Sequence, residues 1–287
     1  MQTKATQLKA IFQRRNATLI PGTPNALFAN VIDSLGFEAA YVTGAGISNM
    51  YLGVPDIGLV TLSELADHVR AISDSVSIPL LVDGDTGFGN AINTYRTVRM
   101  IEAAGASGIQ LEDQEFPKKC GHFSGKEIIP LNEMVQKIKA AVDSRTDGDF
   151  QIIARTDAIA VEGLNAALDR ANAFVEAGAD VIFVEAPVSD GDMARIAREI
   201  PAPQIANIVH GGKTPPLPRS QLAEMGFAGV LYANAALQSA LFAVTETLTS
   251  LKDTGSLDAA KDRLASFEAR QKAVRKETFD LMEKRYT

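Results

Sequence analysis

Eight short apolar runs, spaced on average about 30 residues apart, constrain the fold of this 287-residue chain more than any other feature. They cover residues 19–21, 39–43, 80–83, 108–112, 151–156, 181–185, 204–207 and 229–232. The runs are mainly apolar and do not alternate, which is typical of strands covered on both faces. Because this spacing matches one strand–helix unit, the pattern predicts a parallel sheet with helices between its strands.

The segments between these runs have helical periodicity. Residues 90–104 and 163–177 carry apolar side chains three or four positions apart, and a glycine follows each segment. Helical patterns continue past the last run, over 235–252 and 257–286. We predict an α/β fold, a (β/α)₈ TIM barrel with extra C-terminal helices, as one domain over residues 1–287. A doubly wound open sheet is the alternative, since it also alternates strands and helices.

The composition excludes several classes of protein. The formal net charge is −7, whereas nucleic-acid and anionic-membrane partners require a basic surface. No apolar run approaches the roughly 20 residues that span a bilayer, and residues 1–16 are polar and helical in pattern, unlike a secretory leader. The single cysteine, Cys120, permits no internal disulfide. We expect a cytoplasmic protein that binds a small molecule.

Polar residues gather where the predicted strands end, which is where the active sites of such barrels lie. They are Asp83, Asp85, Glu112, Asp113, Arg155, Asp157, Glu185 and Asn207. Capping of the following helices explains any one of the acids. It does not explain an arginine, an asparagine and two glutamates at equivalent positions, so the sequence predicts a site.

Asp83 and Asp85 form the first motif, D-G-D-T-G-F-G over residues 83–89. Residues two apart in a strand share a face, so the two carboxylates should point to one place. Such a pair repels unless a proton or a cation lies between them. Mg²⁺ prefers one or two carboxylates together with water and substrate oxygens. The motif therefore indicates a metal site, with a capping aspartate in a glycine turn as the alternative.

A second motif, Y-V-T-G-A-G over residues 41–46, follows the second run. It lacks the third glycine and the later acidic residue of a dinucleotide-binding fingerprint. A glycine-rich loop that offers N–H groups to a carboxylate or phosphate fits it better.

The third motif, K-K-C-G-H over residues 118–122, lies in an irregular stretch from 113 to 130. Cationic neighbours lower the pKa of a thiol toward neutrality, where it can exchange protons. A long glycine-containing loop at a barrel mouth is also the usual form of a lid. We interpret the motif as a catalytic thiol on a lid; the alternative is a solvated basic loop with an incidental cysteine.

Together the three motifs resemble the isocitrate lyase/phosphoenolpyruvate mutase superfamily, in order over residues 21–234. K-K-C-G-H is similar to the lyase branch, which includes 2,3-dimethylmalate and 2-methylisocitrate lyases. The resemblance implies a (β/α)₈ barrel whose last helix is exchanged between subunits. It would place residues 235–287 at the subunit interface of a homotetramer, a dimer of helix-swapped dimers.

The resemblance also implies roles for individual residues. The ligands of Mg²⁺, for which Mn²⁺ could substitute, would be Asp85, Asp83, Asp56 and Glu112. The substrate-binding residues would be Thr43, Gly44, Ala45, Gly121, Arg155, Glu185 and Asn207. The catalytic residues would be Cys120 as acid/base, assisted by Lys118 and His122, with Tyr41 as a candidate for the hydroxyl proton. The implied reaction cleaves a 2-hydroxy di- or tricarboxylate to pyruvate and a second carboxylate.

Three departures from the family pattern bear on the substrate. Thr43 stands where lyases commonly have serine, His210 stands where a glutamate is usual, and residues 123–126 read F-S-G-K where methylisocitrate lyases have an R-P-N-K type run. Oxaloacetate hydrolases carry a serine in the region of Pro218, which supplies no hydroxyl, so we favour the lyase. The alternatives are an oxaloacetate hydrolase or decarboxylase, a phosphonomutase of the carboxyphosphonoenolpyruvate or phosphoenolpyruvate mutase type, and a metabolite-binding barrel without catalysis.

Overall fold

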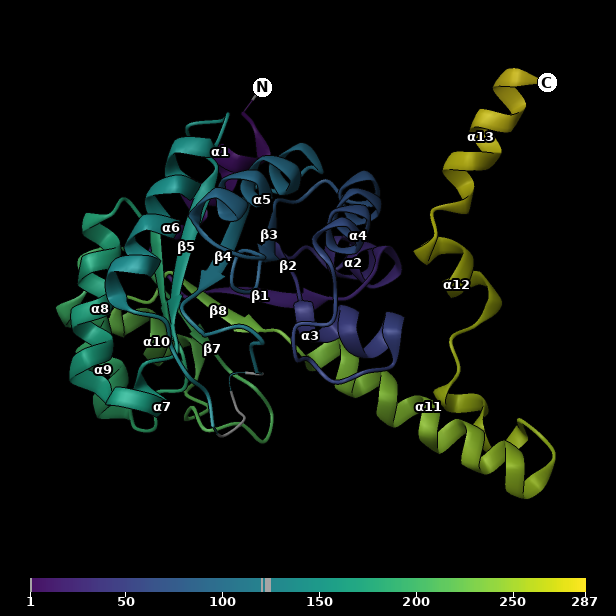
Figure 1. Cartoon of the computed structure of the whole chain (residues 1–287). Helices are drawn as coiled ribbons and strands as arrows, with labels where there is room; N and C mark the ends of the chain where they lie inside the picture. Colours follow the sequence, from purple (N-terminus) through teal and green to yellow (C-terminus); the bar gives the residue numbers. More distant parts are fainter. Residues whose placement is uncertain (1, 120, 122–124) are drawn as a thin grey trace.

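A computed structural model describes residues 2–119, 121 and 125–287 of the chain. Eight parallel strands close into a barrel in sequence order (Figure 1). They are β1 (Thr18–Thr23), β2 (Ala40–Val42), β3 (Leu80–Asp83), β4 (Gly108–Glu112), β5 (Gln151–Thr156), β6 (Val181–Val184), β7 (Gln204–Asn207) and β8 (Gly229–Tyr232). The predicted barrel is confirmed, and the pairing of β1 with β8 excludes the open sheet.

Helices surround the barrel and continue beyond it. Those before β6 are α1 (Lys4–Gln13), α2 (Ala26–Ser34), α3 (Gly44–Ile47), the π-helical turn η1 (Ser48–Leu52), α4 (Leu62–Ser75), α5 (Ala91–Ala103), α6 (Leu131–Ser144), α7 (Ile159–Glu162) and α8 (Leu164–Glu176). Those after β6 are α9 (Asp190–Glu199), α10 (Arg219–Met225), α11 (Ala235–Thr254), the 3₁₀ turn η2 (Asp258–Arg263), α12 (Phe267–Ala273) and α13 (Lys276–Tyr286).

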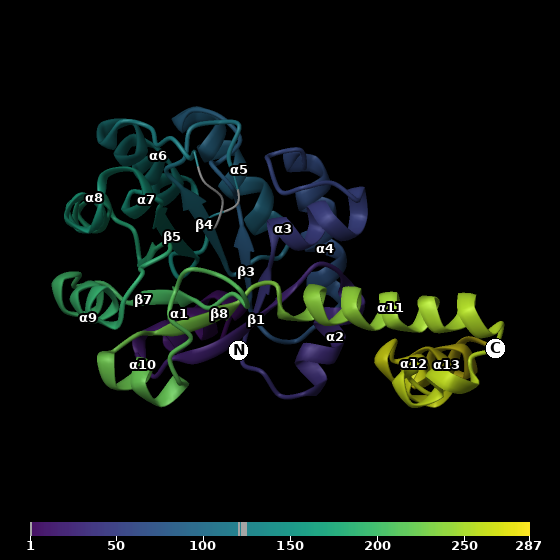
Figure 2. The ribbon, with the colours of Figure 1, turned by 90° about the horizontal axis from the view of Figure 1, so that it is seen from below.

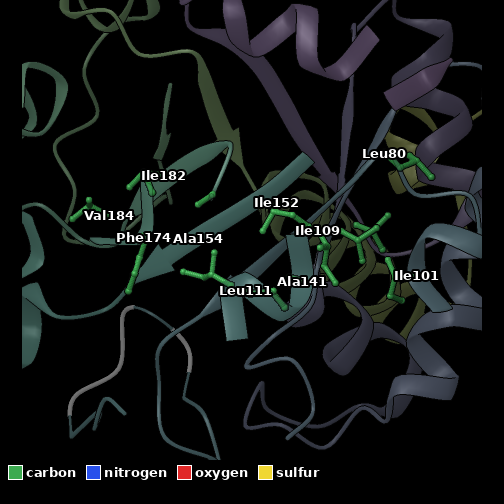
Figure 3. Close-up of a cluster of buried hydrophobic side chains, with 14 of the residues drawn as sticks. Leu80, Ile101, Ile109, Leu111, Ala141, Ile152, Ala154, Phe174, Ile182 and Val184 are labelled. Carbon is green, nitrogen blue, oxygen red and sulfur yellow. The ribbon is translucent and has the colours of Figure 1, made fainter. Parts of the chain in front are cut away.

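The core has two layers, because strands covered on both faces bury all their side chains. The outer layer lies between strands and helices. Figure 3 shows part of it, with Ile109 and Ile152 on the strands, Ile101 on α5 and Phe174 on α8, all inaccessible to solvent. The inner layer fills the barrel itself. β2, β3, β5, β6, β7 and β8 contribute buried apolar side chains to both layers, whereas β4 contributes Ile109 and Leu111 to the outer layer only.

The amino-terminal helix α1 contributes to the inner layer. Thr3 caps it by accepting a hydrogen bond from the Thr6 N–H. Its Leu8, Ile11 and Phe12 are buried in the same cluster as Ile20 of β1 and the other barrel-filling side chains. In barrels of this kind the functional site lies at the carboxyl ends of the strands.

The carboxy-terminal helix α11 extends away from the barrel (Figures 1 and 2), and the chain then turns back so that α12 packs against α2. Large apolar side chains on α11, α12 and α13 are exposed: Leu241, Phe242, Leu248, Phe267 and Phe279 are all more than half accessible. The extra helices of the prediction are therefore present. Among the described residues, no helix combines the length and apolar character that crossing a membrane requires.

Candidate active site

A small polar cavity lies at the carboxyl ends of the strands, with a volume of about 40 Å³. The residues that line it are Tyr41, Thr43, Ala45, Asp56, Asp83, Glu112, Lys118, Lys119, Gly121, Arg155, Phe183, Glu185, Asn207, Val209, Leu231, Ala233 and Asn234. Eleven of the fifteen residues predicted from the sequence are in this set. Gly44 and Asp85 contact members of it, whereas Cys120 and His122 lie outside the described residues.

The glycine-rich loop after β2 lies directly against the carboxylates. Thr43 caps α3, since its Oγ1 accepts a hydrogen bond from Gly46 N–H at 3.2 Å. The Gly44 N–H donates to Asp83 Oδ2 at 3.4 Å. A Cβ on Gly44 would lie 3.2 Å from Asp83 Oδ2 and 3.3 Å from Asp85 Oδ1. A side chain at this position would therefore crowd both carboxylates.

Asp83 and Asp85 converge as predicted, but their partners differ. Asp83 accepts hydrogen bonds from Gly44 N–H, Asp85 N–H and Gln110 Nε2. Asp85 has the left-handed φ of +47°, which is uncommon for a residue other than glycine. Burial raises the pKa of Asp85 to about 6, although Lys118 opposes the rise.

Lys118 brings a cation into this group from the 113–130 loop. Its Nζ lies 2.8 Å from Asp85 Oδ1 and also contacts Asp56 Oδ1, and 3% of its side chain is accessible. Burial alone would lower the pKa of Lys118, but Asp85, Glu112 and Asp56 together raise it well above its usual value. The ammonium group is therefore charged near neutral pH.

Arg155, at the end of β5, is the second cation of the cavity. Its Nε and Nη2 donate to the two oxygens of Asp157, at 2.8 and 3.1 Å. Its Nη1 is 3.6 Å from Glu185 Oε2, and its Nε is 3.4 Å from Glu112 Oε2. The guanidinium carbon lies 5.1 Å from the centre of the Phe183 ring. A buried guanidinium that Asp157 holds in place and that lines the cavity is suited to bind a carboxylate there.

Tyr41 lies at the cavity wall, with its hydroxyl donating to Gln110 Oε1 at 2.9 Å. Burial, and then the charge of Asp83, raise the pKa of Tyr41 well above 10. The phenol is therefore neutral near pH 7. It can donate a hydrogen bond to a substrate oxygen, but it is poorly suited to accept the hydroxyl proton, the role predicted for it.

Two asparagines complete the wall. Asn207 Nδ2 donates to Glu185 Oε2 at 3.4 Å. Within the described residues, the Oδ1 atoms of Asn207 and Asn234 are buried without a hydrogen-bond partner. Buried polar atoms are usually paired, so these two acceptors are suited to a substrate hydroxyl or a water molecule.

The donor set suits a hard divalent cation. Asp56, Asp83, Asp85 and Glu112 offer carboxylate oxygens, and Mg²⁺ needs only one or two of these beside water and substrate. Among the described residues, no group of three or more His, Cys, Asp or Glu side chains is arranged to hold a metal ion. The Lys118 ammonium is the cation that balances Asp56 and Asp85 in this arrangement.

The sequence interpretation missed several contributors. Phe183 is two residues before Glu185, and this spacing could have revealed that the two share a face. Asn234 lies two residues beyond the end of β8, in the region where the other strands carry their site residues. Gln110 lies inside β4, and no pattern distinguishes it from a core residue.

His210 and Pro218, on which the choice of substrate was based, do not line this cavity. His210 lines a neighbouring cavity of about 330 Å³ together with Thr214 and Pro216. Pro218 immediately precedes α10 and lines neither cavity. That its missing hydroxyl disfavours an oxaloacetate hydrolase stays a prediction from the sequence.

The fold and the cavity define a class: a parallel (β/α)₈-barrel protein with buried carboxylates and a guanidinium at the carboxyl ends of its strands. The family model described as phosphoenolpyruvate phosphomutase matches residues 8–252. The chain belongs to this family, within the phosphoenolpyruvate mutase/isocitrate lyase superfamily.

Two similar proteins carry lyase names. The chain is 44% identical to 2,3-dimethylmalate lyase of Eubacterium barkeri over 263 residues, which are 92% of this chain and 91% of that protein. It is also 44% identical to 2-methylisocitrate lyase of Aeropyrum pernix over 257 residues, 90% of this chain and 82% of that protein.

Solved structures of three different activities superpose closely. Oxaloacetate acetylhydrolase with 3,3-difluorooxalacetate has a TM-score of 0.92 at 32% identity, covering 97% of this chain and 96% of that one. For 2,3-dimethylmalate lyase the TM-score is 0.91 at 32% identity, with coverage of 98% and 95%. Phosphonopyruvate hydrolase with oxalate and Mg²⁺ gives 0.89 at 32% identity and 99% coverage of both chains. The fold alone does not choose among these activities.

Proposed function

We propose that the protein is a Mg²⁺-dependent carbon–carbon lyase. Its substrate is a 2-hydroxy di- or tricarboxylate of the 2,3-dimethylmalate or 2-methylisocitrate type, and its products are pyruvate and a second carboxylate. The observation that carries the proposal is the cavity itself, where the buried Arg155 lies among carboxylates that suit a divalent cation. The lyase names of the two relatives at 44% identity support the choice of reaction.

The metal would be held by Asp85 and Asp83, with Asp56 and Glu112 around them. When bound, Mg²⁺ stabilises the oxygens on which negative charge develops. A related structure with oxalate and Mg²⁺ supports this assignment.

The protein's own residues would carry the remaining tasks. Arg155 binds the 2-oxo carboxylate end, together with Thr43 and the N–H groups of Gly44 and Ala45. Glu185 and Asn207 complete the wall of the site. In the proposal, Tyr41 donates a hydrogen bond to a substrate oxygen, because its raised pKa keeps the phenol neutral.

Cleavage transfers one proton at each end of the broken bond. A cavity carboxylate removes the proton of the 2-hydroxyl, and the C2–C3 bond then breaks with its electrons remaining on C3. Cys120 donates a proton to C3, assisted by Lys118 and His122 in the same motif. Lys118 and Gly121, which flank Cys120 in sequence, line the cavity and support this assignment.

An oxaloacetate hydrolase is the second candidate. Structures of oxaloacetate acetylhydrolase superpose with TM-scores up to 0.92, and Pro218 does not line the cavity. The smaller substrate also demands less space in a cavity of this size.

A substrate panel separates the candidates. The purified protein would be incubated with Mg²⁺ and 2,3-dimethylmalate, 2-methylisocitrate, isocitrate, oxaloacetate or phosphonopyruvate. A coupled dehydrogenase detects pyruvate or glyoxylate, and chromatography detects oxalate and acetate. We expect pyruvate from an alkylmalate or from 2-methylisocitrate, and none after EDTA treatment. Oxalate and acetate from oxaloacetate, with no cleavage of the larger acids, would assign the hydrolase instead.

A further inference from the structure

Lys126 is a buried lysine for which the reaction has no direct use. Only 1% of its side chain is accessible, although it lies in the irregular 113–130 stretch. Its Nζ donates to the Gly121 carbonyl and to Asp157 Oδ1, both at 2.6 Å. Lysines are rarely buried, because the ammonium loses its hydration and must recover it through such partners. The position therefore needs an explanation.

Its partner Asp157 also holds Arg155. The Asp157 carboxylate accepts from Arg155 Nε and Nη2 while it accepts from Lys126, and its own N–H donates to Asp113 Oδ1 at 2.9 Å. Burial would raise the pKa of Asp157, but Arg155 and Lys126 together lower it. The carboxylate is thus ionised and shared between a cation of the loop and the arginine of β5.

Its other partner, Gly121, lies against the same arginine. A Cβ at this position would be 2.6 Å from Arg155 Nη2 and 2.7 Å from Glu185 Cδ. The backbone at Gly121 therefore lies so close to Arg155 and Glu185 that a side chain at this position would clash with them. Lys126 holds this backbone by its carbonyl, and no other side-chain hydrogen bond to Gly121 occurs among the described residues.

The two preceding lysines of the loop make different contacts. Lys118 pairs with Asp56 and Asp85 on the opposite side of the cavity. Among the described residues, the Lys119 side chain donates only to the Gly125 carbonyl, a few positions away in the chain. Of the three lysines, only Lys126 shares a hydrogen-bond partner, Asp157, with Arg155.

We propose that Lys126 is a positioning residue, which fixes the Gly121 backbone and the Arg155 guanidinium in one arrangement through the shared Asp157. This inference rests on the proposed function, because it assigns Arg155 to the substrate and the Gly121 segment to the proton donor. It predicts that ligand binding at Arg155 changes the reactivity of Cys120, the neighbour of Gly121 in the sequence.

Lys126→Met tests this coupling, with Lys126→Arg as the conservative variant. The matched control is Lys139→Met, which removes an exposed lysine from α6. Misplacement of a reacting group by about 1 Å costs roughly 100-fold in rate, so we expect kcat of Lys126→Met to fall about 100-fold with little change in KM. Lys126→Arg should restore much of kcat, and Lys139→Met should match the wild type.

A second readout requires no turnover. Cys120 is the only cysteine, so iodoacetamide reports on the loop alone. Oxalate with Mg²⁺ should slow its alkylation about tenfold in the wild type and in Lys126→Arg, but not in Lys126→Met. Thermal unfolding of each variant identifies any loss of folding.

Two results would overturn the inference. One is a Lys126→Met enzyme with wild-type kcat and wild-type oxalate protection. The other is a loss of activity in both Lys126 variants that parallels their loss of thermal stability, since that shows a structural role only. If the wild type cleaves no substrate of the panel, the proposed function fails, while the alkylation experiment still decides the role of Lys126.

Discussion

Lys118 places a permanent positive charge between Asp56 and Asp85, where the proposed metal ligands meet. A buried carboxylate that loses its cation is left uncompensated and attracts another. The ammonium and a divalent cation therefore compete for the same oxygens, and metal affinity depends on how readily Lys118 leaves them.

The first prediction concerns this competition. Lys118→Met should tighten Mn²⁺ binding about tenfold or more, because the charge-assisted contacts of the ammonium are worth about 1.5–3 kcal/mol. Mn²⁺ binding can be followed by electron paramagnetic resonance without any substrate. The same variant should lose activity, since Lys118 assists the proton donor. Unchanged or weaker Mn²⁺ binding would show that the lysine does not compete with the metal.

The second prediction concerns the thiol. Cys120→Ser should lower kcat by about 10²–10⁴, the usual contribution of a general acid, because a serine hydroxyl is a far weaker acid. Mg²⁺-dependent binding of oxalate, measured by calorimetry, should stay close to that of the wild type. If binding is lost together with turnover, Cys120 contributes to the structure of the site and not to proton transfer.

Adjacent residues show what the sequence could not supply. Glu112 and Asp113 are neighbouring acids at the end of β4, yet only Glu112 lines the cavity. Asp113 accepts hydrogen bonds from Thr156, from the Asp157 N–H and from Arg170, 57 positions away in the chain. The spacing of the motifs therefore predicted where the site lies. It could not predict that Asp113 has a structural role, because the partners of Asp113 are distant in the sequence.

At the scale of elements, the end of β5 unites the site. Arg155 faces the cavity, and Asp157 beyond the strand end joins it to the 113–130 loop through Lys126. Asp157 is inaccessible to solvent, so its charge must be compensated by these two cations.

The third prediction is a pH dependence that follows from this pairing. The pKa of Asp157 in the folded protein lies below its ordinary value of 3.8, in spite of burial, because of Arg155 and Lys126. The contribution of the Asp157 carboxylate to the stability of the folded protein is thus complete above about pH 4. It is lost as the pH falls through the lower pKa of the folded state. Asp157→Asn should destabilise the protein by about 3–5 kcal/mol near neutrality.

Urea unfolding of wild type and Asp157→Asn over a pH series measures this difference. We expect it to be constant near neutrality and to shrink in acid, below about pH 4. A difference that persists or grows in acid would contradict the assigned ionisation.

The strands were the part of the fold that the sequence predicted best. The runs 80–83, 108–112, 151–156, 204–207 and 229–232 coincide with β3, β4, β5, β7 and β8, because unbroken apolar runs are distinctive in a strand–helix repeat. β1 is longer than its run, since Pro21 and Gly22 interrupt the apolar pattern. The short α3 and the π-helical turn after β2 carry no periodicity long enough to detect.

At the scale of the whole molecule, α11–α13 lack a core of their own. α11 extends away from the barrel (Figure 1), and α12 contacts the barrel layer at α2. Leu241, Phe242, Leu248, Phe267 and Phe279 of these helices are nevertheless exposed. Each such side chain would gain about 1.5–3 kcal/mol on burial. We propose that a second copy of this chain covers them, with residues 235–287 at the interface of a homotetramer.

The fourth prediction tests this assembly. The double variant Leu241→Asp, Phe242→Asp should shift the protein from tetramer to monomer in sedimentation equilibrium, because two charges cannot be buried in an apolar contact. Thr249→Asp, which adds charge at an exposed polar position of the same helix, should leave the tetramer intact. A wild type that sediments as a monomer would contradict the proposal directly.

The arrangement of the site belongs to the whole barrel, since residues of seven strands or their following loops converge on one cavity. The order of strands made this convergence predictable, whereas the substrate depends on a few atoms of the cavity wall. Solved structures with at least three different activities share this fold, so only a measurement of the reaction distinguishes between them.

The central claim, cleavage between C2 and C3 with protonation of C3, is tested most directly in D₂O. With 2,3-dimethylmalate and Mg²⁺, we predict pyruvate and propionate that carries one deuterium at its α-carbon, detected by proton NMR and mass spectrometry. Under the same conditions, release of oxalate and acetate from oxaloacetate, with no cleavage of the dimethylmalate or of 2-methylisocitrate, would contradict the assignment as a lyase.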